Sequence, residues 1–129
     1  MVVADFEAGL GTIMRLSGNP VDIVVVVCEP TAKSLDVGSR AAESVRAAEL
    51  GRVVVSANRV RNATDEARVH AAFPGFELML VPDDPAIVAA ERAGAAPLDA
   101  APTAPAVRAL VALAERLLDG RIPAARTGQ

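Results

Sequence analysis

Three kinds of residue are scarce in this 129-residue chain, and each scarcity excludes a class of protein. Cys28 is the only cysteine, which excludes an internal disulfide and a multi-thiolate zinc site within one chain. The only aromatic residues are three phenylalanines, too few for a surface that stacks single-stranded bases. Lys33 is the only lysine and the net charge is −3, which disfavours broad electrostatic capture of nucleic acid. We therefore expect no nucleic-acid partner.

Long apolar runs are also missing. The longest strong run, Ile23–Cys28, is far shorter than the roughly 18 residues of a membrane helix, so no membrane span is expected. The first residues carry no secretory signal. Hydrophobic residues make up 52% of the chain, which excludes a disordered protein and suits one aliphatic core. We expect a cytoplasmic protein with one domain over residues 1–120 and a flexible tail over residues 121–129.

Short β-branched runs alternate with helical patterns along the chain. The runs expected to form strands are Val2–Ala4, Val21–Cys28, Arg52–Ser56 and, more weakly, Phe76–Val81. The expected helices are Leu35–Leu50 with Gly51 as its stop, one capped by Thr64, one from Asp84-Pro85 to Gly94, and Ala104–Leu118, with a loop over Ala95–Thr103. This alternation predicts an α/β fold with a mainly parallel sheet and flanking helices.

Polar residues gather where the expected strands end, which is where parallel sheets bind ligands. The four junctions read Asp5-Phe6-Glu7-Ala8-Gly9, Glu29-Pro30-Thr31, Asn58-Arg59-Val60 and Pro82-Asp83-Asp84. In this order they resemble the later part of the MinD/ParA-type P-loop ATPases. The resemblance is closest to the CooC-like branch, associated with nickel insertion into carbon monoxide dehydrogenase, and it spans roughly residues 2 to 118.

The resemblance implies a three-layer, P-loop NTPase-like fold whose first strand and phosphate loop are missing. No G-x-x-x-x-G-K-[ST] segment occurs in the chain, and Lys33 is not preceded by glycine. The resemblance therefore implies either a truncated family member or one whose N-terminal part comes from another chain. A complete member would bind ATP or ADP with Mg²⁺ and dimerise.

The first junction implies a metal and switch site. By resemblance, Asp5 would help to hold Mg²⁺ through water, and Glu7, Ala8 and Gly9 would form the switch that senses the γ-phosphate. The alternatives are an ordinary strand-end aspartate at Asp5 and a flexible glycine-containing loop after it.

The later junctions imply a base-binding site. By resemblance, the amide of Asn58 would contact the edge of adenine and Pro82 would lie near the base, while Arg59 replaces the usual lysine. The alternative for Asn58 is an asparagine that satisfies the backbone of a turn.

Three other residue types have simpler explanations than chemistry. The Cys-x-Cys pair of the CooC-like branch is absent, so Cys28 is expected to be a core residue and not a metal ligand. His70 has no predictable triad partners and is expected on or near a helix surface. The Asp83-Asp84 pair could suggest paired carboxylates, but helix capping by Asp84 explains it at lower cost. No catalytic residue is assigned.

Two hypotheses of function follow. In the first, the chain is part of a nucleotide-dependent switch ATPase linked to metal-centre maturation, with a metalloenzyme client, and is inactive in hydrolysis without its phosphate loop. In the second, it is a non-catalytic α/β scaffold that self-associates or pairs with a separate chain carrying the missing N-terminal half. A flavodoxin-like or receiver domain fits the strand–helix rhythm but lacks the expected acidic cluster and late lysine.

Overall fold

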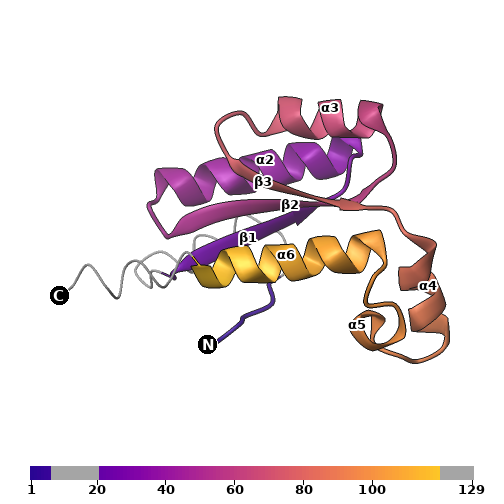
Figure 1. Cartoon of the computed structure of the whole chain (residues 1–129). Helices are drawn as coiled ribbons and strands as arrows, with labels where there is room; N and C mark the ends of the chain where they lie inside the picture. The colour runs from indigo at the N-terminus through magenta and orange to yellow at the C-terminus, as the bar shows by residue number, and fades with distance from the viewer. Residues whose placement is uncertain (7–20, 120–129) are drawn as a thin grey trace.

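The computed structural model describes residues 1–6 and 21–119, and residues 21–119 form a parallel sheet with helices on both faces (Figure 1). The strands are β1 (Ile23–Cys28), β2 (Arg52–Val60) and β3 (Glu77–Pro82). The helices are α2 (Ala32–Ala47), α3 (Ala63–Ala72), α4 (Pro85–Arg92), α5 (Pro97–Ala100) and α6 (Pro105–Asp119). The predicted α/β class with a parallel sheet is confirmed, and the arrangement is compatible with a three-layer P-loop NTPase-like fold.

The three strands lie in the order β1-β2-β3, and both pairings are parallel. Helices α2 and α3 cover one face, α6 covers the other face over β3, and α4 and α5 lie beyond the ends of the strands (Figure 1). Because each parallel pair needs a crossover connection, the helices between the strands form one layer of the fold. The carboxyl ends of all three strands therefore meet at one edge.

The core lies between the sheet and the α2–α3 layer. Val55 and Ala57 of β2 are fully buried on this face, and Phe73 closes the core at the end of α3. Phe73 meets Phe76 edge-on, with ring centroids 6.4 Å apart, and the guanidinium of Arg46 lies 4.2 Å from the centroid of the Phe76 ring. A core of valines, alanines and one aromatic pair agrees with the aliphatic composition.

Two helices begin where side chains cap them, which corrects the predicted starts. Helix α2 starts at Ala32 and not at Leu35, because the hydroxyl of Thr31 accepts a hydrogen bond from the Ser34 backbone N–H. Helix α3 is capped by Asn62 and not by Thr64, because the Asn62 side-chain oxygen accepts from the Asp65 N–H at 2.9 Å. In both cases the cap precedes the apolar periodicity that the sequence displays.

The sequence predicted Gly51 as the end of α2, but Gly51 has a different role. The helix ends at Ala47, and the chain then turns through Glu49, which has a φ of 51°. A Cβ atom at Gly51 would lie only 2.3 Å from the carbonyl oxygen of Val21, so glycine is required for close approach of two backbones. The predicted loop over Ala95–Thr103 also differs, since it contains the short helix α5.

The strand expected over Val2–Ala4 is wrong: residues 1–6 form no strand, and Val2 is 94% exposed. So short a run gains strand geometry only from a hydrogen-bonded neighbour, and no strand among residues 21–119 pairs with residues 1–6. The predicted tail over residues 121–129 lies outside the described residues. Within the two ranges that are described, no helix is long and apolar enough to cross a membrane.

Candidate functional site

The structure brings three of the four predicted junctions together at the carboxyl edge of the sheet. Arg59, at the end of β2, lies between the residues that follow the two neighbouring strands. Its guanidinium is 3.6 Å from a carboxylate oxygen of Glu29 after β1 and 3.6 Å from one of Asp83 after β3. These long, solvent-exposed ion pairs link the three strand ends without fixing them tightly.

A break in the β2–β3 ladder presents Arg59 to solvent. Ala57 pairs with Leu80 and Val60 with Pro82, so the pairing is irregular across Asn58 and Arg59. Arg59 adopts a left-handed φ of 58°, and the Asn58 side-chain oxygen accepts the Arg59 N–H at 3.1 Å. Irregularities of this kind redirect side chains near binding sites. Asn58 here satisfies its own turn, and its amide NH₂ has no hydrogen-bond partner among the described residues.

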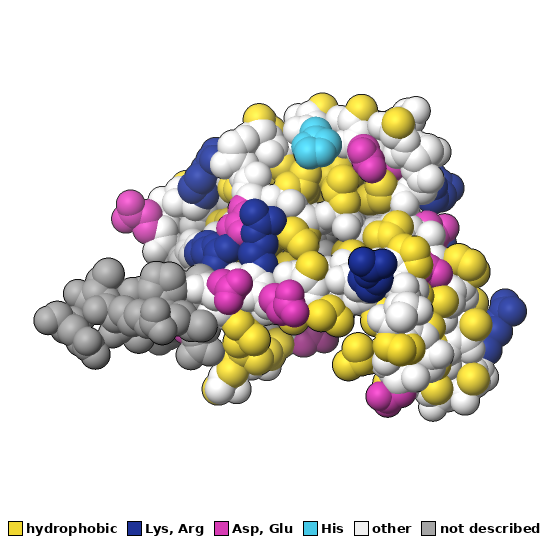
Figure 2. All heavy atoms as spheres, in the orientation of Figure 1, with side chains coloured by type: hydrophobic (Ala, Val, Ile, Leu, Met, Phe, Trp, Pro, Cys, Tyr) yellow, Lys and Arg dark blue, Asp and Glu magenta, His cyan; other side chains and the backbone are white. Residues whose placement is uncertain are grey.

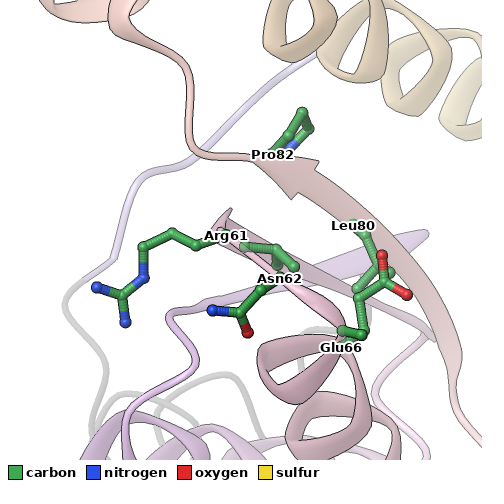
Figure 3. A pocket seen from close by; sticks show the side chains of 7 residues that line it. Arg61, Asn62, Glu66, Leu80 and Pro82 are labelled. Atoms are coloured by element: carbon green, nitrogen blue, oxygen red, sulfur yellow. The ribbon is translucent and has the colours of Figure 1, made fainter.

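A shallow hollow of about 420 Å³ lies beside this edge, between the ends of β2 and β3 and the start of α3 (Figure 3). Its apolar floor comes from the strands, and its polar rim comes from the segment that enters α3. Figure 3 shows Glu66 beside Leu80, with the guanidinium of Arg61 extending away from them. The lining residues are Val60, Arg61, Asn62, Ala63, Glu66, Leu80 and Pro82.

Of the three residues predicted to bind nucleotide, only Pro82 lines this hollow. Asn58 and Arg59 lie two residues or fewer from Val60, on the same strand end, but they do not line it. None of the residues predicted from the sequence to form the site lies at the start of α3, which lines the hollow. An Asn-x-x-Asp capping pattern at Asn62 and Asp65 was the available signal.

The rim of the hollow is held by a buried carboxylate. Asp65 is almost fully buried and accepts hydrogen bonds from the Arg61 backbone N–H at 3.0 Å and from the Arg61 Nε at 3.2 Å. The Arg61 backbone hydrogen bond, and then its guanidinium, hold the pKa of Asp65 below its ordinary value. Together with the hydrogen bond from the Asp65 N–H to Asn62, these contacts fix the backbone of Arg61 and Asn62 at the start of α3.

Asp84 is the helix cap that the sequence predicted. Its two carboxylate oxygens accept from the backbone N–H of Ala86 in α4 and of Ala106 in α6, each at 3.0 Å. The hydrogen bond from the Ala106 N–H, and then the one from the Ala86 N–H, lower the pKa of Asp84. The predicted capping role is confirmed, and Asp84 additionally joins the starts of two helices. Asp83 points elsewhere, to Arg59.

Of the metal and switch residues predicted from the first junction, the structure describes only Asp5. Asp5 lies in an exposed segment that does not follow a strand of the sheet. Glu7, Ala8 and Gly9 lie outside the described residues. Within residues 1–6 and 21–119, no group of three or more His, Cys, Asp or Glu side chains could hold a metal ion. Their roles in Mg²⁺ binding stay predictions.

Cys28 and His70 have the positions that the sequence suggested. Cys28 is buried in the core, and desolvation raises the pKa of its thiol to about 11, which keeps it protonated at neutral pH. His70 is exposed on α3 and lies on the outer surface, where it is the cyan side chain of Figure 2.

An ionic cluster at the opposite, amino-terminal edge of the sheet was not predicted. Glu77, at the start of β3, accepts from the Arg52 Nε at 2.9 Å and lies 2.9 Å from the Arg116 Nε of α6. The hydrogen bonds from Arg52 lower the pKa of Glu77. Arg52, Glu77 and Arg116 are far apart in sequence, so no local pattern signals the cluster.

Comparisons with known proteins supply no family for this arrangement. A scan of the sequence against protein-family models found no match, and a search of curated proteins found none either.

Proposed function

We propose that this chain is the base-binding part of a P-loop-type, nucleotide-dependent switch protein. The observation that carries the proposal is the convergence of Glu29, Arg59 and Asp83 at the carboxyl edge of a parallel sheet. In sheets of this kind ligands bind at that edge. The metal-maturation role and the metalloenzyme client implied by the resemblance remain finer predictions.

The chemistry of the edge suits a planar, polar base. The free NH₂ of Asn58 is a donor, and its oxygen already accepts one hydrogen bond from Arg59. Pro82 and Leu80 provide apolar surface in the neighbouring hollow, and the exposed guanidinium of Arg59 can stack on an aromatic ring.

Phosphate binding is the part that this chain does not supply. The sequence contains no glycine-rich phosphate loop, and a triphosphate needs such backbone donors and a lysine for transfer. The proposal therefore predicts weak binding of ATP and ADP, with similar affinities, and no hydrolysis by the chain alone.

Calorimetric titration of ATP, ADP and adenosine in the presence of Mg²⁺ tests the proposal. We expect all three ligands to bind with dissociation constants on the order of 0.1–1 mM, because the base and not the phosphates makes the contacts. Asn58→Asp retains an oxygen for the Arg59 N–H but removes the NH₂ donor. It is expected to weaken binding about 10-fold or more while leaving the folded state intact.

The matched control is Ser39→Ala, on the outer face of α2, where the hydroxyl only bonds the Asp36 carbonyl. This variant should bind like the wild-type chain. Absence of adenosine binding at millimolar concentration would refute the proposal, as would equal binding by the wild-type and Asn58→Asp chains.

A further inference from the structure

The outer edge of β1 is a sheet edge without the usual protection. β2 pairs with one edge of β1, and no strand among the described residues pairs with the other. The sequence Ile23–Cys28 contains no charge or proline, and Val27 is 65% exposed. Solitary edge strands usually carry charges, bulges or prolines that block pairing with other chains. Continuous apolar runs of this kind are typical of strands in the interior of parallel sheets.

Helix α2 extends this apolar character beside the edge. Gly38 and Arg46 of α2 face Phe73 and Phe76, at the end of α3 and just beyond it. The flank on the opposite side of the helix is uncharged along its whole length and consists of Ser34, Val37, Ala41, Ser44 and Ala48.

The charged residues of α2 lie elsewhere, on its outer surface and on the side that faces α3. They include two ion pairs, Asp36 with Arg40 and Glu43 with Arg46. Since α2 packs over β1 and β2 and contacts α3 on one side, its uncharged flank lies on the side of the open β1 edge. Small side chains on this flank would let a second helix approach closely.

We propose that a second copy of this chain covers this surface, with the two β1 strands paired antiparallel about a two-fold axis. An isologous interface requires a surface that complements itself. An uncharged strand edge bordered by a helix flank of small, uncharged residues meets this requirement, because no like charges are opposed. The result is a continuous six-stranded sheet with the two α2 flanks packed together on one face.

The hydrogen-bond pattern restricts the register of this pairing. Along a strand, successive residues point their N–H and C=O groups alternately toward the partner strand and away from it. In an antiparallel pair, two directly opposed residues must both point these groups toward the partner strand or both point them away. Val25 and Val26 are adjacent and point these groups in opposite directions, so a symmetric pair cannot place Val25 of one copy opposite Val26 of the other. That forbidden register is the one that would bring Asp22 opposite Glu29. The axis therefore passes between the two copies of a single residue, Val25 or Val26, and each acidic side chain faces an uncharged position.

Light scattering after size exclusion, over a ~100-fold range of concentration, tests the proposal. We expect the wild-type chain to show twice the mass of one chain at high concentration. Val27→Lys places a charge on the open face of the edge strand, within the segment that would pair, and is expected to raise the dimer dissociation constant at least ~10-fold. Circular dichroism is expected to be unchanged, because Val27 makes little contact within one chain.

Val88→Lys is the matched control, since Val88 is 46% exposed on α4, away from the β1 edge, and its substitution should leave the dimer unchanged. A monomeric wild-type chain overturns the proposal. This includes a monomer in which the amides of β1 exchange slowly, since residues of the same chain would then cover the strand. A dimer that resists Val27→Lys, or dissociates equally in Val88→Lys, overturns it as well. Neither result bears on adenosine binding, so the two proposals can fail separately.

Discussion

The two ends of the sheet carry ionic clusters of opposite design. At the amino-terminal edge, one carboxylate, Glu77, lies between Arg52 and Arg116, with contacts of 2.9 Å and a side chain only 23% exposed. At the carboxyl edge, one guanidinium, Arg59, lies between Glu29 and Asp83 at 3.6 Å and is 63% exposed. The contacts of the first cluster are shorter and include hydrogen bonds from Arg52 to a half-buried carboxylate, whereas the contacts of the second are longer and open to solvent.

This difference separates stability from binding. Removal of one partner from a partly buried, hydrogen-bonded ion pair destabilises the folded protein, whereas exposed ion pairs contribute little to its stability. The amino-terminal cluster therefore joins β2, β3 and α6, while the carboxyl cluster can rearrange around a ligand at small cost. Both clusters use arginine and carboxylate, so residue types alone do not distinguish them.

The largest loss of stability is expected where two backbone segments lie in close contact near the amino-terminal edge, at Gly51. Gly51→Ala places a Cβ atom against the carbonyl of Val21, which is backbone and cannot move aside easily. We expect a loss of about 3 kcal/mol in the free energy of unfolding, measured by urea denaturation. Gly94→Ala is the control: it has a φ of 67° but open space around it, so it should lose about 1 kcal/mol. Equal losses would contradict the assigned role of Gly51.

The contributions of the two clusters to stability can be compared by replacing one carboxylate in each with an amide of the same shape. Glu77→Gln removes the charge that two arginines share and is expected to lose about 2 kcal/mol in urea denaturation. Asp83→Asn at the carboxyl edge should lose less than about 0.5 kcal/mol. If Asp83→Asn is the more damaging change, the distinction between the two edges is wrong.

Acid should weaken the protein through its hydrogen-bonded carboxylates. The pKa values of Glu77, Asp65 and Asp84 lie below their ordinary values in the folded chain, so the unfolded chain binds more protons in acid. Their stabilisation is complete above about pH 5 and is lost as the pH falls through the folded-state pKa values. Thermal unfolding from pH 7 to 3 should show a steep fall below about pH 4, and a shallower one in Glu77→Gln. An identical slope in that variant would contradict the assigned role of Glu77.

The smallest effect is expected at the carboxyl edge. Arg59→Gly relieves a left-handed backbone while it removes two weak ion pairs, so the free energy of unfolding should stay within about 0.5 kcal/mol of the wild-type value. Arg92→Gly, in the last turn of α4, should instead lose several tenths of a kcal/mol to about 1 kcal/mol, because glycine disfavours helix. A loss at Arg59 that exceeds the loss at Arg92 would show that the edge is structural.

The sequence predicted well what depends on local pattern. Apolar runs located the three strands, and Asp84-Pro85 located the start of α4, because alternation and capping are local properties. The Val2–Ala4 strand failed, since a strand forms only with a neighbour that no local pattern reveals.

Parts of the site could not be predicted for the same reason. The irregular pairing at Asn58-Arg59, the burial of Asp65 and the Glu77 cluster all arise from tertiary contacts. The strand-end rule correctly indicated which edge to inspect, but not that Arg59 would bridge its two neighbours.

Backbone amide shifts during an adenosine titration test the central claim most directly. If the carboxyl edge binds the base, the amides of Asn58, Arg59, Asn62 and Asp83 should shift together and saturably, while those of Arg52 and Glu77 at the opposite edge stay unchanged. Shifts at the amino-terminal edge, or none at either end, would contradict the account.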